Sequence, residues 1–225
     1  MKSKTNKSSN KGKWIAIILG LVAIIGVVWV FSYTPEPDKE NAKTLNMEGQ
    51  PTIGDKDASV QIVEMGDIMC PACKSWSLNY YPVIKEKYID TGKVTFSFTN
   101  VLFHGEASTI GAQAFEAAYA LYPDHFWDYL HNLYQEQPDH AGHDEVWITE
   151  ELAVEVASKT IPNFNKDEFM AKMKSEEVLE QINIDQALVG ETGLQLTPGI
   201  FINGVELTDP FDGDKIVELI EEGLK

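Results

Sequence analysis

The sequence predicts an α/β fold that is divided by a helical insertion and preceded by one transmembrane helix. Residues 59–101 read as strand, helix and strand, residues 106–190 read as a series of helices, and two strands and a helix follow near the C-terminus. A strand–helix–strand unit is expected to be right-handed with parallel strands. We therefore assign the core to residues 51–104 and 191–225, and the helical insertion to residues 105–190.

The N-terminal region has the features of an uncleaved membrane anchor. Residues 1–13 carry five lysines and no acidic residue, whereas residues 14–33 carry no charge. A transmembrane helix needs about 20 apolar residues, and flanking lysines keep their side of the helix in the cytoplasm. A cleaved signal peptide would have a shorter apolar region that ends in a small-residue site. We expect a single-pass protein of the cell membrane, with residues 1–13 cytoplasmic and the folded domain outside.

The segment after the anchor, residues 34–50, is rich in proline, asparagine and charge and predicts a flexible tether. The chain has 35 acidic residues against 18 basic ones, and its net charge is −17. Phosphate contacts require a basic surface, so this composition excludes nucleic-acid binding.

Cys70 and Cys73 are the only cysteines in the chain. A disulfide between them would close so short a loop that it would stabilise the fold only weakly. Structural zinc requires four ligands, and only the histidines of a predicted loop, His140 and His143, could complete the set. A redox couple is the interpretation that remains, with a metal-binding or folding module without turnover as the more distant alternative.

The predicted strand delivers Cys70 to the start of a helix, with Pro71 at the first helical position, where a missing N–H costs nothing. The unpaired N–H groups and the positive end of that helix favour the thiolate. We therefore expect a lowered pKa for Cys70 and a reactive sulfur. Cys73 lies one turn further on and should be less exposed. Cys70 would then react with the partner, and Cys73 would resolve the mixed disulfide.

Three features together resemble the thioredoxin fold and, within it, the DsbA-like thiol–disulfide oxidoreductases. The first is "CPAC" at the strand-to-helix junction, and the second is "LTPGIFING", which contains Thr197 and Pro198. The third is the long helical interval between them. The resemblance covers about residues 50–225. It implies a cis Pro198 against the disulfide and a helical domain inserted between the βαβ half and the C-terminal ββα half.

The resemblance also implies an activity. A membrane-anchored, extracytoplasmic member would introduce disulfides into exported polypeptides that contain cysteines, and a membrane protein would reoxidise its dithiol. No organic cofactor is implied beyond the Cys70–Cys73 disulfide. Pro71 and Ala72 between the cysteines would tune the redox poise, and Thr197 would affect substrate preference. A disulfide isomerase or a thioredoxin-like reductase would use the same residues.

Glu64 lies six residues before Cys70, in the predicted strand. The resemblance implies a buried carboxylate at this place, beneath the disulfide. Burial would raise the pKa of Glu64 and let it accept a proton from the resolving cysteine, directly or through water. The alternative is a glutamate at the end of the strand that points to solvent.

Glu116 and Asp185 interrupt helices that are otherwise small and apolar. A buried carboxylate must have a partner. That partner is expected to be a lysine or a helix N-terminus, or else a calcium ion, which takes carboxylate and backbone oxygens. A calcium ion here would join the insertion to the core.

Overall fold

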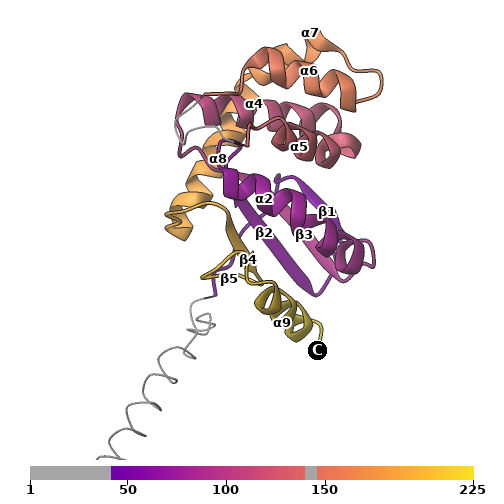
Figure 1. Cartoon of the computed structure of the whole chain (residues 1–225), viewed down its shortest axis with the longest axis vertical. Helices are drawn as coiled ribbons and strands as arrows, with labels where there is room; N and C mark the ends of the chain where they lie inside the picture. The colour runs from indigo at the N-terminus through magenta and orange to yellow at the C-terminus, as the bar shows by residue number, and fades with distance from the viewer. Residues whose placement is uncertain (1–41, 140–145) are drawn as a thin grey trace, which may run out of the picture. The chain divides into compact units, whose positions relative to one another are not determined.

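A five-stranded sheet forms the centre of the described part of the chain (Figure 1). The computed structural model describes residues 42–139 and 146–225. The strand order is β1-β3-β2-β4-β5; β2 and β3 are parallel, and the other neighbours are antiparallel. The strands are β1 (Thr52–Gly54), β2 (Val60–Gly66), β3 (Val94–Asn100), β4 (Gly199–Ile202) and β5 (Val205–Glu206).

Helices follow β2, fill the interval between β3 and β4, and close the chain. They are α2 (Pro71–Asn79), α3 (Tyr81–Ile84), the π-helical turn η2 (Lys85–Ile89), α4 (Glu106–Leu121), the 3₁₀ turn η3 (Pro123–His125), α5 (Phe126–Gln135), α6 (Glu150–Thr160), α7 (Lys166–Met173), α8 (Glu176–Thr192) and α9 (Gly213–Gly223). The helix after β2 breaks at Tyr80, because Pro82 lacks the N–H that would continue the ladder.

One face of the sheet is covered by α2, α3 and α9. Successive side chains of a strand point to opposite faces, and Ile62 of β2 packs on this face with Trp76 of α2 and Ile220 of α9. Glu64 is two residues beyond Ile62 and shares its face. The fold therefore places the Glu64 carboxyl beneath α2, the helix that carries Cys73.

The opposite face is covered by the end of α8 and by the chain that precedes β1. Met65 of β2 packs there with Leu188 and with Leu45. The composition predicts a flexible tether over residues 34–50, but the end of this segment lies on the domain. Leu45 is buried, and Lys43 N donates to the carbonyl of Gly204 at 2.8 Å. The apolar Leu45 side chain gives the segment surface to bury.

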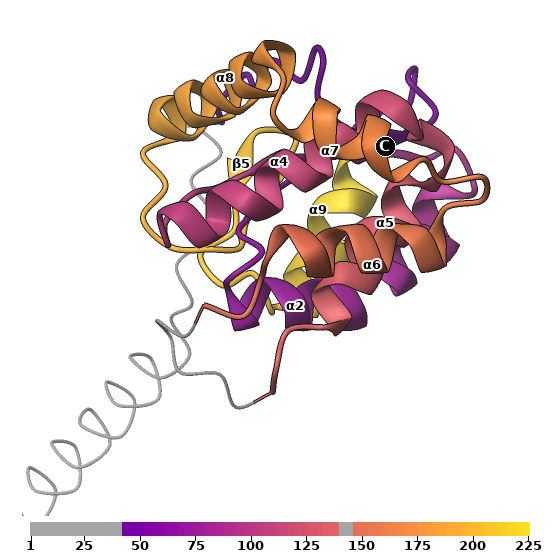
Figure 2. The same cartoon turned by 90° about the horizontal axis from the view of Figure 1, so that it is seen from above.

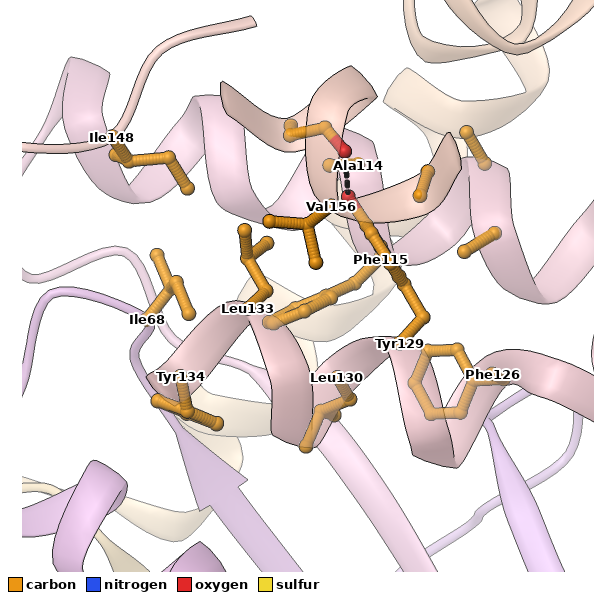
Figure 3. Packing of buried hydrophobic residues seen from close by; sticks show 14 of the residues in the cluster. Ile68, Ala114, Phe115, Phe126, Tyr129, Leu130, Leu133, Tyr134, Ile148 and Val156 are labelled. Carbon is orange, nitrogen blue, oxygen red and sulfur yellow. Dashed lines mark hydrogen bonds between the residues drawn. The ribbon is translucent and has the colours of Figure 1, made fainter. Parts of the chain in front are cut away.

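The insertion consists of α4 to α7, which pack together in both views (Figures 1 and 2), and α8, which returns to the sheet. Its core is aromatic: the Phe115 ring lies within 6.3 Å of the rings of Phe126, Tyr129 and Tyr134 (Figure 3). The predicted helices are confirmed in type and order. Their rings supply the buried surface that stabilises amphipathic helices.

The predicted anchor, residues 14–33, lies outside the described residues, as do His140 and His143. Within residues 42–139 and 146–225, none of the helices has the length and the hydrophobicity needed to span a bilayer.

Candidate active site

The end of β2 and the start of α2 hold the two cysteines. Cys70 is the N-cap residue of α2, and Pro71 follows at its first turn. The turn between strand and helix is fixed by Asp67, whose carbonyl accepts from Cys70 N at 3.0 Å and whose carboxylate accepts from Met69 N at 2.9 Å. The structure thus places Cys70 at the helix end that the sequence predicts.

Cys70 and Cys73 are free thiols in the structure. Cys70 is 8 % exposed, and Cys73 is fully buried. The pKa of Cys70 is lowered to about 6, mainly by a hydrogen bond from the Cys73 thiol. Burial opposes this shift, whereas hydrogen bonds from the Thr197 side chain and from the backbone of Cys73 and Ala72 add to it. Burial, and then the hydrogen bond to Cys70, raise the pKa of Cys73 well above its usual range. Cys70 is therefore the cysteine that favours the thiolate form near neutral pH.

The Thr197–Pro198 peptide bond is cis and precedes β4. The Cys70 sulfur lies 3.3 Å from the Thr197 carbonyl oxygen, which accepts a hydrogen bond from the thiol. A cavity of about 490 Å³ opens beside Cys70 and is lined by Phe103, His104 and residues 194–197. A second cavity of about 560 Å³ is lined in part by Thr197 and Pro198. The Cys70 sulfur thus faces open space on the side of the segment that contains Thr197 and Pro198, which we call the proline loop.

Glu64 is 2 % exposed and lies between Phe98 of β3 and Ile200 of β4 in the register of the sheet. The pKa of Glu64 is raised well above its usual range, mainly by burial and secondly by the charge of Cys70. The charge of Glu64 also raises the pKa of Cys73. The carboxyl is therefore buried beneath the thiols, as expected from the resemblance, and does not point to solvent.

Asp67 is fully buried and accepts hydrogen bonds from both sides of the site. The sequence pattern does not single it out, because its further donors follow 36 to 41 residues later in the chain. They are Phe103 N at 3.0 Å, His104 Nδ1 at 2.8 Å and Ser108 Oγ at 2.9 Å, all on Oδ2. Asp67 therefore joins the cysteine loop to the start of α4.

Glu116 and Asp185 come together, although they are far apart in the chain. The Asn100 amide donates to Glu116 Oε1 at 2.7 Å and to Asp185 Oδ2 at 2.8 Å, and the Gln50 amide donates to Asp185 Oδ1 at 2.7 Å. The expected lysine or helix N-terminus is not the partner; amide groups are. Among the described residues, no group of three or more histidine, cysteine or acidic side chains is placed to hold a metal ion.

Comparisons with known proteins agree with this geometry. The family model described as Thioredoxin matches residues 46–222. The chain is 36 % identical over 180 residues to disulfide bond formation protein D of Bacillus subtilis, which covers 80 % of this chain and 79 % of the relative. It is 34 % identical over 221 residues to a probable disulfide bond formation protein D of Bacillus anthracis, with 97 % of this chain and 99 % of the relative covered.

Solved structures show the same fold. The crystal structure of oxidised BdbD from Bacillus subtilis matches with a TM-score of 0.76 and 34 % identity, over 81 % of this chain and 97 % of that chain. DsbA of Chlamydia trachomatis matches in fold, with a TM-score of 0.68 and 23 % identity over 84 % of this chain and 95 % of that one. A reactive Cys70 above a buried Cys73 suits the exchange of thiols and disulfides. This chain is a thiol–disulfide oxidoreductase that belongs to the thioredoxin family, together with disulfide bond formation protein D.

Proposed function

We propose that this oxidoreductase works in the oxidising direction and donates its Cys70–Cys73 disulfide to exported polypeptides that contain cysteines. Residues 14–33 anchor it in the cell membrane, with the catalytic domain outside and the N-terminus in the cytoplasm. A second membrane protein reoxidises the dithiol, because a dithiol carries no oxidant of its own. The uncharged segment and its flanking lysines support the anchor.

The lowered pKa of Cys70 is the observation that carries the direction of transfer. A thiolate held by a hydrogen bond from the Cys73 thiol stabilises the dithiol form of the protein. Such stabilisation makes the disulfide a stronger oxidant, because more free energy is released when it is reduced. A leaving thiolate of low pKa also departs faster from the mixed disulfide. Both effects favour oxidation of the substrate.

The reaction proceeds in two exchanges. A substrate thiolate attacks the Cys70 sulfur, a substrate–Cys70 disulfide forms, and the bond to Cys73 breaks. Cys73 leaves as a buried thiolate, and the Glu64 carboxyl beneath it supplies the proton. A second substrate thiolate then attacks the substrate sulfur of the mixed disulfide, and Cys70 leaves as a thiolate. The substrate has lost two electrons, and the Cys70–Cys73 pair has gained them.

The reduction potential of the Cys70–Cys73 couple tests the direction. We expect a value near or above about −180 mV, the range of protein disulfide isomerase, whereas thioredoxin lies near −270 mV. The full chain in detergent is equilibrated with glutathione buffers, and free thiols are counted. The same chain in denaturant is the control, since unfolding removes the hydrogen bonds on Cys70. A value near that of thioredoxin would instead indicate a reductase, the alternative that the same residues allow.

We also propose a calcium ion at Glu116 and Asp185. Both carboxyl groups contact one Asn100 amide, so they converge, and Glu116 lines a cavity of about 220 Å³ together with Glu177 and Gln181. Calcium takes carboxylate, amide and water oxygens, and rotation of a side-chain amide exchanges its nitrogen for its oxygen. The two carboxylates and the amide oxygens of Asn100 and Gln50 would be the protein ligands, and waters would complete the set. A bound ion would neutralise the paired carboxylates and join α4 and α8.

Removing calcium is expected to lower the melting temperature of the full chain by several degrees. A ligand at 100 times its dissociation constant stabilises the folded protein by about 2.7 kcal/mol. For a domain of this size, each kcal/mol shifts the melting temperature by about 2–4 °C. A thermal melt with a chelator, and then with excess calcium, measures the shift. Asp185→Asn should remove the dependence on calcium, and Asp212→Asn, at the exposed start of α9, should keep it. An equal melting temperature with chelator and with calcium excludes the ion.

A further inference from the structure

Two buried polar atoms face the same small space beside Gly66. They are Oε1 of Glu64 and the hydroxyl of Tyr134, and neither has a hydrogen-bond partner among the described residues. A Cβ built on Gly66 would lie 3.2 Å from the glutamate oxygen and 3.1 Å from the tyrosine hydroxyl. Both atoms thus lie close to the position that a side chain at residue 66 would take. The Phe98 ring edge is 2.7 Å from that Cβ position and borders the same space.

The fold brings these groups together from distant elements. Glu64 and Gly66 lie on β2, on the face beneath α2, whereas Tyr134 lies near the end of α5 in the insertion. Figure 3 shows Tyr134 beside Ile68, away from the Tyr129 hydroxyl at the other side of the cluster. The Cys73 sulfur is at the same end of β2, because it accepts a hydrogen bond from Asp67 N at 3.5 Å. The thiol, the carboxyl and the phenol therefore share one buried neighbourhood.

Buried polar groups are nearly always hydrogen-bonded, and a single water with two to four polar partners satisfies groups that cannot reach each other. Tyr134 and Glu64 are both at least nine-tenths buried, with 0 % and 2 % of their surface exposed. A water beside Gly66, slightly farther from the Phe98 ring than a Cβ would be, has both atoms within reach. A side chain at position 66 would fill this place, so glycine is required for the space.

We propose that Tyr134 is a positioning residue of the exchange reaction: its hydroxyl and the Glu64 carboxyl hold one water beside Gly66, and this water carries the proton between Glu64 and Cys73. The role rests on the exchange of thiols and disulfides and is independent of its direction.

The proton balance is the same in both directions. When Cys73 leaves as a thiolate, the Glu64 carboxyl gives its proton to the water, and the water gives one of its own to the Cys73 sulfur. When the Cys73 thiol attacks the Cys70 sulfur of a mixed disulfide, its proton moves to the water and another moves from the water to Glu64. One proton crosses, no electron moves with it, and the water is unchanged.

Tyr134 is suited to orient this water because it remains a donor throughout. Burial first, and then the charges of Cys73 and Glu64, raise the pKa of Tyr134 far above the working range. A phenol that keeps its proton occupies one acceptor position of the water. The second acceptor position then faces the group that gives a proton, and one hydrogen of the water faces the group that receives a proton. Substitution of the hydroxyl leaves the water free to rotate.

Tyr134→Phe tests the role with oxidised glutathione as the probe. The reduced full chain first forms a Cys70–glutathione mixed disulfide and releases one glutathione thiolate; Cys73 then forms the Cys70–Cys73 disulfide and releases the second. We expect the second step to slow about fivefold, the usual effect of losing a hydrogen bond between neutral groups, with a shifted pH–rate profile. The first step should be unchanged. Cys70, Asp67 and Tyr81 are the other titratable groups that face this region, and the substitution leaves them in place.

Tyr129→Phe is the matched control, because it removes a buried hydroxyl from the same helix that donates to Ala153 O at 3.1 Å, away from the cysteines. It should leave both steps unchanged. In the Glu64→Gln background, Tyr134→Phe should have no further effect on the second step. An unchanged rate and pH profile in Tyr134→Phe, or equal effects with and without Glu64, overturns the proposal. The reduction potential decides the oxidising function separately.

Discussion

Replacing Cys70 by serine is expected to abolish disulfide exchange, whereas replacing Cys73 by alanine should trap the mixed disulfide. Only Cys70 combines a pKa of about 6 with access to the cavity beside the proline loop. Cys73 is fully buried, and its pKa is raised well above its usual range. Loss of the nucleophile should lower the exchange rate by on the order of 10³-fold or more.

Intact mass spectrometry after mixing each reduced variant with oxidised glutathione measures the two roles. Cys73→Ala should gain one glutathione that persists, and Cys70→Ser should gain none. The two variants are matched controls, because each removes one sulfur from the same helix turn. Glutathione on Cys70→Ser, at a rate equal to that of Cys73→Ala, would reverse the assigned roles. A Cys70→Ser protein that keeps its cellular function would indicate a binding module without turnover.

The sequence is informative where local chemistry decides the structure. The Val- and Ile-rich run that ends at the cysteines predicts β2, and the cysteine–proline junction predicts the start of α2. The helical spacing of apolar residues between β3 and β4 predicts the insertion. In each case the spacing of the apolar residues and the residue type at the end of the segment predict the same helix or strand.

The sequence is silent where distant contacts decide the structure. β1 has three residues, too few for a period, and it forms only because β3 offers an edge. Asp67 becomes a junction through donors at the start of α4, and Tyr134 lies near Gly66 only because α5 packs against α2. Glu116 and Asp185 are recognisable as unusual in their helices, yet their amide partners, Asn100 and Gln50, come from β3 and the segment before β1. No local pattern contains this information.

The reduced protein is expected to gain stability relative to the oxidised protein as the pH rises from about 6 to about 9. The pKa of Cys70 is about 6 in the folded dithiol and has an ordinary value of 9.0. In this interval the unfolded dithiol binds a proton that the folded dithiol has released, so stability rises with pH. The contribution of Cys70 is fully present above pH 9 and is lost as the pH falls through 6, whereas the raised pKa of Cys73 lowers stability above pH 9. Three pKa units correspond to about 4 kcal/mol, as an order of magnitude.

Denaturant unfolding of the reduced and the oxidised full chain, at several pH values, measures this difference. The oxidised form is the internal control, because its Cys70 sulfur has no proton to lose, whereas the burial that raises the pKa of Glu64 is present in both forms. Subtraction therefore removes the effect of burial on Glu64, and the raised pKa of Cys73 affects stability only above the interval from pH 6 to 9. Reduced Cys70→Ser should lose the dependence between pH 6 and 9. A difference that stays constant over this interval would show that Cys70 is not a stabilised thiolate. An oxidising potential would then have no physical basis in Cys70, because the reduction potential measures the same free-energy difference between the dithiol and disulfide forms.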